Sequence, residues 1–420
     1  MKRWTVFYGW WVVVACSSAM LFTSGIIHFG FTAVFEPIAR EFGWGYAQIS
    51  LAASLRGLEI GLLAPVTGLL VDRWGPRRLI FGGAIVTGCG LILLSRINSL
   101  GMFYGAFILI AVGMSTCSHT VMMAAVSNWF RKRAGIAIGV MASGVALGGL
   151  MIPVITVLID LLDWRRAMVI LGLGAWIIVI PLSLVVRHRP EQYGYLPDGE
   201  IGSAEVNPGR VGEAQTAEVN IQPGKALKSR PFWQLASALT CYAFVINAVV
   251  THIMPYLSSV GVGRMSSSLV AGALPVASIG GRIGFGWLGD KHNKRLASAA
   301  GFLLIGLGLL LFDYAARDGS WTLLLFLALF GTGWGANVTL RATLLREYFG
   351  RERFGTIHGF IIGIMMMGNI AGAPVAGWAF DRWGSYQGVW FAFSGVAIAA
   401  MVIMATLPKV DHTVKPLEKS

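Results

Sequence analysis

The chain has 420 residues, of which 55% are hydrophobic and only 13% are charged, and its net charge is +13. Soluble domains carry roughly 25% charged residues, so this chain cannot cover itself with a water-soluble surface. The composition excludes cytosolic enzymes, disordered tails and secreted disulfide scaffolds, and it predicts an all-α integral membrane protein. The four cysteines lie in apolar stretches without metal-binding spacing, which predicts buried apolar residues and no metal site.

Twelve charge-poor segments are long enough to cross the hydrocarbon core of a bilayer, which takes about 20 helical residues. The first follows Lys2 and Arg3 and is too long for a signal peptide, whose apolar region has about 7–15 residues. The predicted spans cover residues 8–35, 46–71, 79–95, 101–128, 134–160, 166–187, 231–258, 266–289, 296–313, 320–345, 354–380 and 386–408.

A polar segment separates the sixth span from the seventh. Residues 187–230 are rich in Gly, Pro, Glu and Asn and show no apolar period, which predicts a linker. We therefore expect three parts: a six-helix bundle over residues 1–188, a linker over residues 189–230 and a second six-helix bundle over residues 231–420.

The basic residues predict the orientation of the spans. Of the 33 lysines and arginines, 23 fall in segments on the same side as the N-terminus, 7 fall in loops on the opposite side and three lie within spans. Loops rich in Lys and Arg stay in the cytoplasm, so both termini and the linker are expected there. Because the positive charge follows topology, it does not indicate a nucleic-acid partner.

Motifs of the first half recur in the second half at nearly constant spacing. GLLVDRWGPRR, which begins at Gly68, is matched by GWLGDKHNKR, which begins at Gly286, 218 positions later. Pro153 returns as Pro374 after 221 positions. Parallel six-helix repeats predict two pseudo-symmetric bundles, related by an axis along the membrane normal, with a central cavity between them.

The GLLVDRWGPRR loop resembles the signature loop of the major facilitator superfamily, and the resemblance covers nearly the whole chain. Four further stretches are similar to those of monocarboxylate porters and of the bacterial oxalate–formate antiporter group. They are NWFRKRAGIAIGVMASGVALGG from Asn128, HIMPY from His252, GGRIGFGWLGD around Arg282 and RPEQYGYLPDG from Arg189. The resemblance implies a secondary transporter in the cytoplasmic (inner) membrane, working as a monomer and without a cofactor. Motifs typical of enzymes, such as GxSxG, HExxH or a Walker loop, are absent from the sequence.

Arg282 is the leading candidate for substrate binding. A charged side chain near the centre of a membrane helix costs about 2.5–3.5 kcal/mol on insertion scales, and Arg282 lies ~24 Å from the outer end of its span at 1.5 Å per residue. Glycines surround it and no carboxylate lies within one turn. A guanidinium of this kind suits bidentate capture of a carboxylate, and in the resembling family the arginine at this position binds the substrate anion. A structural ion pair with another helix is the alternative.

Other polar residues within the spans are candidate substrate contacts, with a structural role in the core as the alternative for each. His252 occupies a position where the family places a cavity histidine. His119 and Asn337 are repeat partners 218 positions apart, which indicates a shared depth in the membrane. Two further candidates are Tyr256 and His28.

Four charged residues are candidates for gating or coupling. Arg56 and Glu59 are three positions apart and can pair on one helical face, so a structural role competes with gating or proton transfer. In the superfamily, the acid at the position of Asp72 clamps cytoplasmic helix ends together, and Asp290 lies in the matching loop of the second half. Arg341, near the cytoplasmic end of its span, is expected to snorkel to the headgroups.

The chain departs from the family pattern at several charged positions. It has no lysine between Lys2 and Lys132, and Ser278 stands where animal porters carry an acid. The stretch from Met365 to Gly368 lacks the second cation of the oxalate–formate antiporter. Proton symport therefore lacks its usual carriers, and a single firm cavity cation favours one carboxylate over two.

We therefore expect a secondary transporter of small organic monocarboxylate anions that works by rocker-switch alternating access, with proton coupling an open alternative. An organic-anion antiporter and a drug exporter of the same fold are the nearest rivals. A membrane receptor or scaffold that binds a ligand without moving it is a more remote one, because the linker has no apolar pattern that could fold into an output domain.

Overall fold

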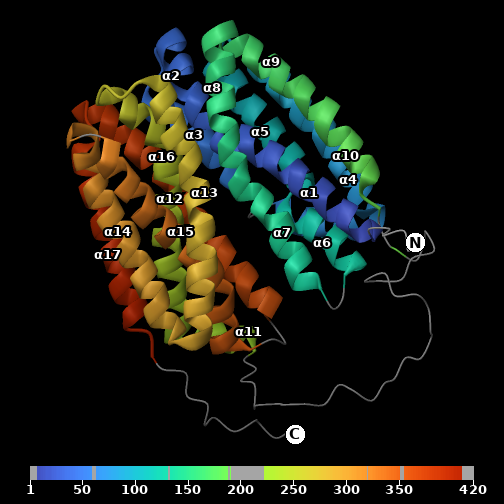
Figure 1. Cartoon of the computed structure of the whole chain (residues 1–420), viewed down its shortest axis with the longest axis vertical. Coiled ribbons are helices and arrows are strands. Elements are labelled where there is room, and N and C mark those ends of the chain that lie inside the picture. The colour runs from blue at the N-terminus through green and yellow to red at the C-terminus, as the bar shows by residue number, and fades with distance from the viewer. Residues whose placement is uncertain are drawn as a thin grey trace, which may run out of the picture. The chain divides into compact units, whose positions relative to one another are not determined.

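The computed structural model describes residues 7–58, 63–130, 133–187, 190, 222–318, 320–350 and 354–408. In this part of the chain the regular structure is helical throughout, with no strand (Figure 1). The predicted all-α fold is therefore confirmed. It follows from the apolar composition, because a segment surrounded by lipid has to satisfy its backbone hydrogen bonds within itself.

Thirteen helical elements lie before the predicted linker among the described residues. They are α1 (Tyr8–Thr23), η1 (Ser24–Phe29), α2 (Phe31–Phe42), α3 (Tyr46–Leu58), α4 (Ala64–Leu94), α5 (Leu100–Thr116), α6 (His119–Trp129), α7 (Ala134–Leu147), η3 (Gly148–Leu150), α8 (Met151–Leu162), α9 (Trp164–Gly174), η4 (Ala175–Val179) and α10 (Ile180–Val185). The remaining elements are α11 (Pro223–Leu227), α12 (Arg230–Ser259), α13 (Arg264–Lys291), α14 (Lys294–Asp318), α15 (Ser320–Phe349), α16 (Phe354–Trp383) and α17 (Gln387–Ala405).

Eleven helical segments of the described chain are long and apolar enough to cross a membrane. The predicted second span, 46–71, is interrupted by residues outside the described part. The first segment runs from Tyr8 to Phe42 through the π-helical turn η1, so it extends past the predicted end at residue 35. It ends at Gly43, whose φ of 65° gives the left-handed C-cap that glycine adopts without strain.

A sharp turn within α4 separates the second predicted span from the third. Gly75 has φ 77° and ψ 158°, outside the helical region, and Pro76 follows it. A residue before proline is disfavoured in helical geometry, and only glycine adopts this positive φ readily. The Gly-Pro pair of the GLLVDRWGPRR motif is therefore what turns the chain back into the membrane.

The chain forms two compact units that cut across its sequence halves. Unit 1 consists of Met1–Ile201, Asn247–Val276 and Ile370–Tyr386, and unit 2 consists of Gly202–Ile246, Ala277–Asn369 and Gln387–Ser420. Helices α12, α13 and α16 each contribute one end to each unit. The division at residues 188 and 230 stays a prediction, and most of the predicted linker lies outside the described residues.

Small residues set the helix spacing inside unit 1. A side chain at Gly144 of α7 would collide with the backbone of Ser17 on α1, and one at Gly113 of α5 would collide with Thr87 on α4. Such close approach is how membrane helices gain packing energy, because lipid gives apolar surfaces no reason to associate. The prediction that all cysteines are buried is wrong for Cys89, which is exposed. An apolar stretch in a membrane protein can face lipid instead of the core.

Candidate functional site

Arg282 lies on α13 within unit 2, where this helix approaches α15 closely. The backbone of Thr332 on α15 leaves no room for a side chain at Gly281, and Gly335 of α15 faces the backbone of Ser278 and Arg282 in the same way. The Thr339 hydroxyl donates a hydrogen bond to the Arg282 carbonyl oxygen at 3.4 Å. The glycines thus hold the two helices together at the level of the arginine.

The Arg282 guanidinium is half-buried. Its Nε has no hydrogen-bond partner in the described part of the chain, and no described carboxylate forms an ion pair with it. On α12, in the same unit, the Tyr242 hydroxyl donates to the Trp334 carbonyl oxygen at 3.2 Å. Among the residues that the structure describes, the alternative of a structural ion pair for Arg282 therefore finds no acidic partner.

A second arginine lies within a helix of unit 2. Arg341 on α15 is half-buried. Its described hydrogen-bond contact joins Nη1 to the Met365 sulfur on α16, 3.7 Å away. Snorkelling of Arg341 to the headgroups, expected from its position in the sequence, stays a prediction.

His252, on the part of α12 that belongs to unit 1, is fully buried. Its Nδ1 lies 2.7 Å from the Tyr386 hydroxyl, and its Nε2 lies 2.9 Å from both the Ser50 hydroxyl and the Ala373 carbonyl oxygen. A carbonyl oxygen only accepts hydrogen bonds, so Nε2 carries a proton. In the neutral ring Nδ1 then accepts from Tyr386.

Tyr386, in the turn between α16 and α17, is also buried, and burial raises the pKa of its hydroxyl well above the ordinary value. The phenol therefore stays protonated and able to donate to His252. This network joins α3 of the first half to α12 and α16 of the second, all within unit 1. No sequence pattern indicates Ser50 or Tyr386 as a site residue, because neither belongs to a charged or repeated motif.

Asp381, near the end of α16, caps the N-terminus of α3. Its Oδ1 accepts from the Tyr46 amide at 2.8 Å and its Oδ2 accepts from the Ala47 amide at 2.9 Å. The first amides of a helix lack partners of their own, and the helix dipole favours a negative charge there. The Tyr46 ring also stacks on Phe380, with 4.5 Å between ring centroids. The sequence contained a signal for this residue, because FDRWG around Asp381 repeats the VDRWG of the signature loop.

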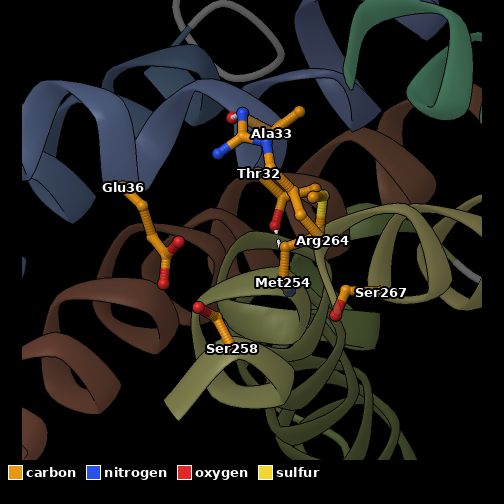
Figure 2. Close-up of a pocket in the computed structure, with 7 residues that line it drawn as sticks. All are labelled: Thr32, Ala33, Glu36, Met254, Ser258, Arg264 and Ser267. Atoms are coloured by element: carbon orange, nitrogen blue, oxygen red, sulfur yellow. Dashed lines mark hydrogen bonds between the residues drawn. The ribbon is translucent and has the colours of Figure 1, made fainter. Parts of the chain in front are cut away.

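A small pocket lies at the same end of unit 1 (Figure 2). Arg264 of α13 pairs through Nε with Asp160 of α8 at 2.8 Å, and its Nη2 donates to the Ala33 carbonyl oxygen on α2 at 2.9 Å. The Met254 amide donates to the Thr32 hydroxyl at 3.3 Å. The pocket is lined by Thr32, Ala33, Glu36, Met254, Ser258, Arg264 and Ser267. Its walls therefore tie helices of the first half to α12 and α13.

The remaining predicted substrate contacts are dispersed. Asn337 is buried, accepts from the Ser298 hydroxyl of α14 at 2.6 Å and donates to the Gly333 carbonyl oxygen at 3.2 Å. His119, in unit 1, is the exposed first residue of α6. The shared depth of His119 and Asn337 stays a prediction. Tyr256 is buried against Tyr386, and His28 is half-buried in η1 with its ring against Phe29.

The gating candidates lie mostly outside the described residues. Glu59 and the side chains of Arg56 and Asp72 belong to that group. The Arg56–Glu59 pair and the clamp at Asp72 therefore stay predictions. Asp290 is described and is exposed near the end of α13.

Together these features define a multi-pass membrane protein: apolar helices, tight small-residue packing, and cationic side chains half-buried within helices that are apolar enough to span a membrane. The chain belongs to the major facilitator superfamily, since the model of that family, described as Major Facilitator Superfamily, matches residues 15–361 and, in a second match, residues 261–420. Members of this family are transporters and not enzymes.

Two kinds of relative accompany this assignment. The chain is 26% identical to Monocarboxylate transporter 12-B of Danio rerio over 98% of this chain and 90% of that one. It is 23% identical to the Oxalate:formate antiporter of Oxalobacter formigenes over 98% and 94%. The fold resembles the inward-facing, occupied crystal structure of a bacterial homolog of the human lysosomal transporter Spinster, with a TM-score of 0.71 and 16% identity over 96% of this chain and 95% of that one.

Proposed function

We propose that the protein is a secondary active transporter of small organic carboxylate anions, the simplest of which carry a single carboxylate group. In this proposal Arg282 binds that carboxylate group. The observation that carries this proposal is the half-buried guanidinium without a described acidic partner. A cation in that setting is stabilised when an anion arrives, and a guanidinium holds a carboxylate through two parallel hydrogen bonds. The names of the relatives, a monocarboxylate transporter and an oxalate:formate antiporter, support the same substrate class.

The contacts at one end of unit 1 act, in this proposal, as the closed outer gate of a rocker-switch cycle. They are the Asp381 cap on α3, the His252 network and the contacts of Arg264. A typical intramolecular hydrogen bond contributes only about 0.5–1.5 kcal/mol, so a gate built from a few of them can open in every cycle. His252 and Asn337 thus serve gating and packing, and Arg282 serves substrate binding.

The charge distribution supports the orientation of this gate. An excess of Lys and Arg keeps a loop in the cytoplasm, so the basic segments of this chain support a cytoplasmic position for both termini. The gate lies at the opposite ends of the helices and would therefore face outward from the cytoplasmic (inner) membrane. The transporter would work as a monomer, because the proposed site needs residues of one chain only.

Uptake into proteoliposomes tests the proposal. Wild-type protein should accumulate labelled short-chain monocarboxylates, and Arg282→Ala should abolish the signal. Arg282→Lys, which keeps the charge but loses the bidentate geometry, should retain a fraction of it. Full uptake by Arg282→Ala would refute carboxylate binding by this residue. Absence of monocarboxylate uptake by the wild-type protein would favour a drug exporter, which does not need the arginine. Uptake with and without an imposed pH gradient decides whether protons accompany the anion.

A further inference from the structure

We propose that His252 makes the outer gate sensitive to the pH outside the cell: the closed gate encloses the neutral ring, and a proton taken up from outside holds the gate open. The inference deepens the proposed function and rests on the gate proposed there. Histidine suits this role, since it is the side chain whose unperturbed charge changes between pH 5 and 8.

The hydrogen bonds of His252 are those of a neutral ring. The Ser50 hydroxyl donates to the Tyr46 carbonyl oxygen at 2.6 Å, so it accepts from the ring. Nε2 lies 2.9 Å from both the Ser50 oxygen and the Ala373 carbonyl oxygen, and it therefore faces two acceptors with its one hydrogen. Nδ1 accepts from the Tyr386 hydroxyl, 2.7 Å away. A second ring proton, on Nδ1, would force that hydroxyl to turn its hydrogen away.

Burial adds to the cost of a charged ring in the closed gate. His252, Ser50 and Ala373 have no exposed surface, and Tyr386 is only 1% exposed. The Phe35 ring of α2 closes a further side, with 5.1 Å between ring centroids. No described carboxylate forms an ion pair with His252. Because a buried charge without an ionic partner is costly, closure of the gate favours the neutral ring.

The charged side chains nearest this end of the helices that contact the ring have other partners or face solvent. They are Glu36 with Arg40 at 3.7 Å and Glu41 with Arg165 at 2.7 Å from α2, and, from α16, Asp381 on the amides of α3 and the exposed Arg382. Glu36 also lines the pocket of Figure 2. The neighbouring tyrosines, Tyr46, Tyr256 and Tyr386, are phenols, which do not change charge between pH 5 and 8.

The open and closed gates therefore bind different numbers of protons at His252. In the open gate the ring meets water, where histidine takes up a proton near pH 6.5, whereas the closed gate excludes that proton. Because the open state binds more protons, acid shifts the equilibrium toward it. Between about pH 8 and about pH 5.5 the ratio of open to closed gate should rise about tenfold. External acid would thus favour the state that receives substrate from outside.

Cysteine labelling of intact cells at controlled external pH tests this switch. Ala53 is buried and lies three positions after Ser50, on the same face of α3. Ala53→Cys, in a background without the exposed Cys89, should therefore react with a membrane-impermeant maleimide only when the gate opens. Dividing each rate by that of N-acetylcysteine at the same pH removes the pH dependence of the thiol reaction itself. The corrected rate should rise about tenfold from about pH 8 to about pH 5.5.

Variants identify the group that titrates. His252→Gln keeps a donor and an acceptor but cannot be charged, so its corrected rate should not change with pH. His252→Asn is a second uncharged variant and should behave in the same way if His252→Gln does not fold. Glu36→Gln removes the carboxylate that lines the neighbouring pocket, and it should keep the full pH response of the parent.

Each other result has a distinct meaning. A corrected rate in the parent that is independent of pH, or that falls in acid, overturns the pH switch and leaves the gate standing. A response that survives in the histidine variants, or that is lost in Glu36→Gln, assigns the titration to another group and also overturns the switch. If nothing labels from outside at any pH, the proposed gate falls and the switch falls with it, while uptake of carboxylates still tests substrate binding.

Discussion

Removing the Asp381 carboxylate should open the proposed outer gate. In Asp381→Ala the amides of Tyr46 and Ala47 lose acceptors that lie 2.8 and 2.9 Å away. Loss of an N-cap acceptor costs about 0.5–2 kcal/mol, and loss of a negative charge at a helix N-terminus costs about 0.3–1 kcal/mol. The two effects overlap, so we expect a total of about 1–2 kcal/mol. Since 1.4 kcal/mol is a tenfold change in an equilibrium constant, the open population should rise by roughly 5–30-fold.

A cysteine placed beneath the gate measures this population. Ala373 is fully buried and its carbonyl oxygen lies 2.9 Å from His252, so Ala373→Cys should react only when the gate opens. Cells treated with a membrane-impermeant maleimide report the opening from outside, in a background without the exposed Cys89. When closing outpaces labelling, the rate follows the open population. Asp381→Ala should therefore label roughly 5–30-fold faster than the parent.

Two matched variants make the test specific. Asp381→Asn keeps one acceptor, and Asn caps helices about as well as Asp, so its labelling should rise much less. Arg382→Ala removes the adjacent charge, which is also exposed, and should leave the rate unchanged. The reasoning is refuted if Asp381→Ala labels at the parental rate, or if Arg382→Ala accelerates labelling as much.

Two further predictions concern packing and ion pairing. Gly335→Ala should lower the melting temperature and abolish uptake, because the added methyl group would collide with the backbone of Ser278. Gly280→Ala is the control, because nothing lies within 4 Å of the position of its added methyl group. This control should behave as wild type in the same thermal and uptake assays. The side chains of the ion pair Arg264–Asp160 are 28% and 46% exposed. A double-mutant cycle on thermal stability should therefore return a coupling free energy of only about 0.2–1 kcal/mol. A coupling free energy well above that range would show that the pair is desolvated.

Much of the fold could be predicted from the sequence, because a bilayer imposes local rules. Each spanning segment satisfies its own backbone hydrogen bonds, so the apolar runs alone indicated the helices. The depth of a residue along a span follows from the rise per residue, which predicts that Arg282 lies deep within its span. Local conformation was also accessible, since Gly75 before Pro76 turns the chain where the repeated motif predicted a loop.

The neighbours of each side chain were decided only by the tertiary structure. Sequence position predicts how deep a residue lies, but not which helix faces it. Asp381 meets amides more than 330 positions away, and His252 meets Ser50, 202 positions away. Arg341 of α15 meets the sulfur of Met365 on α16, 3.7 Å from its Nη1. The amino-acid sequence by itself determined that the chain is a membrane transporter with a cationic side chain within a span. Helix packing decided which side chains contact one another, because those contacts join segments that no local pattern connects.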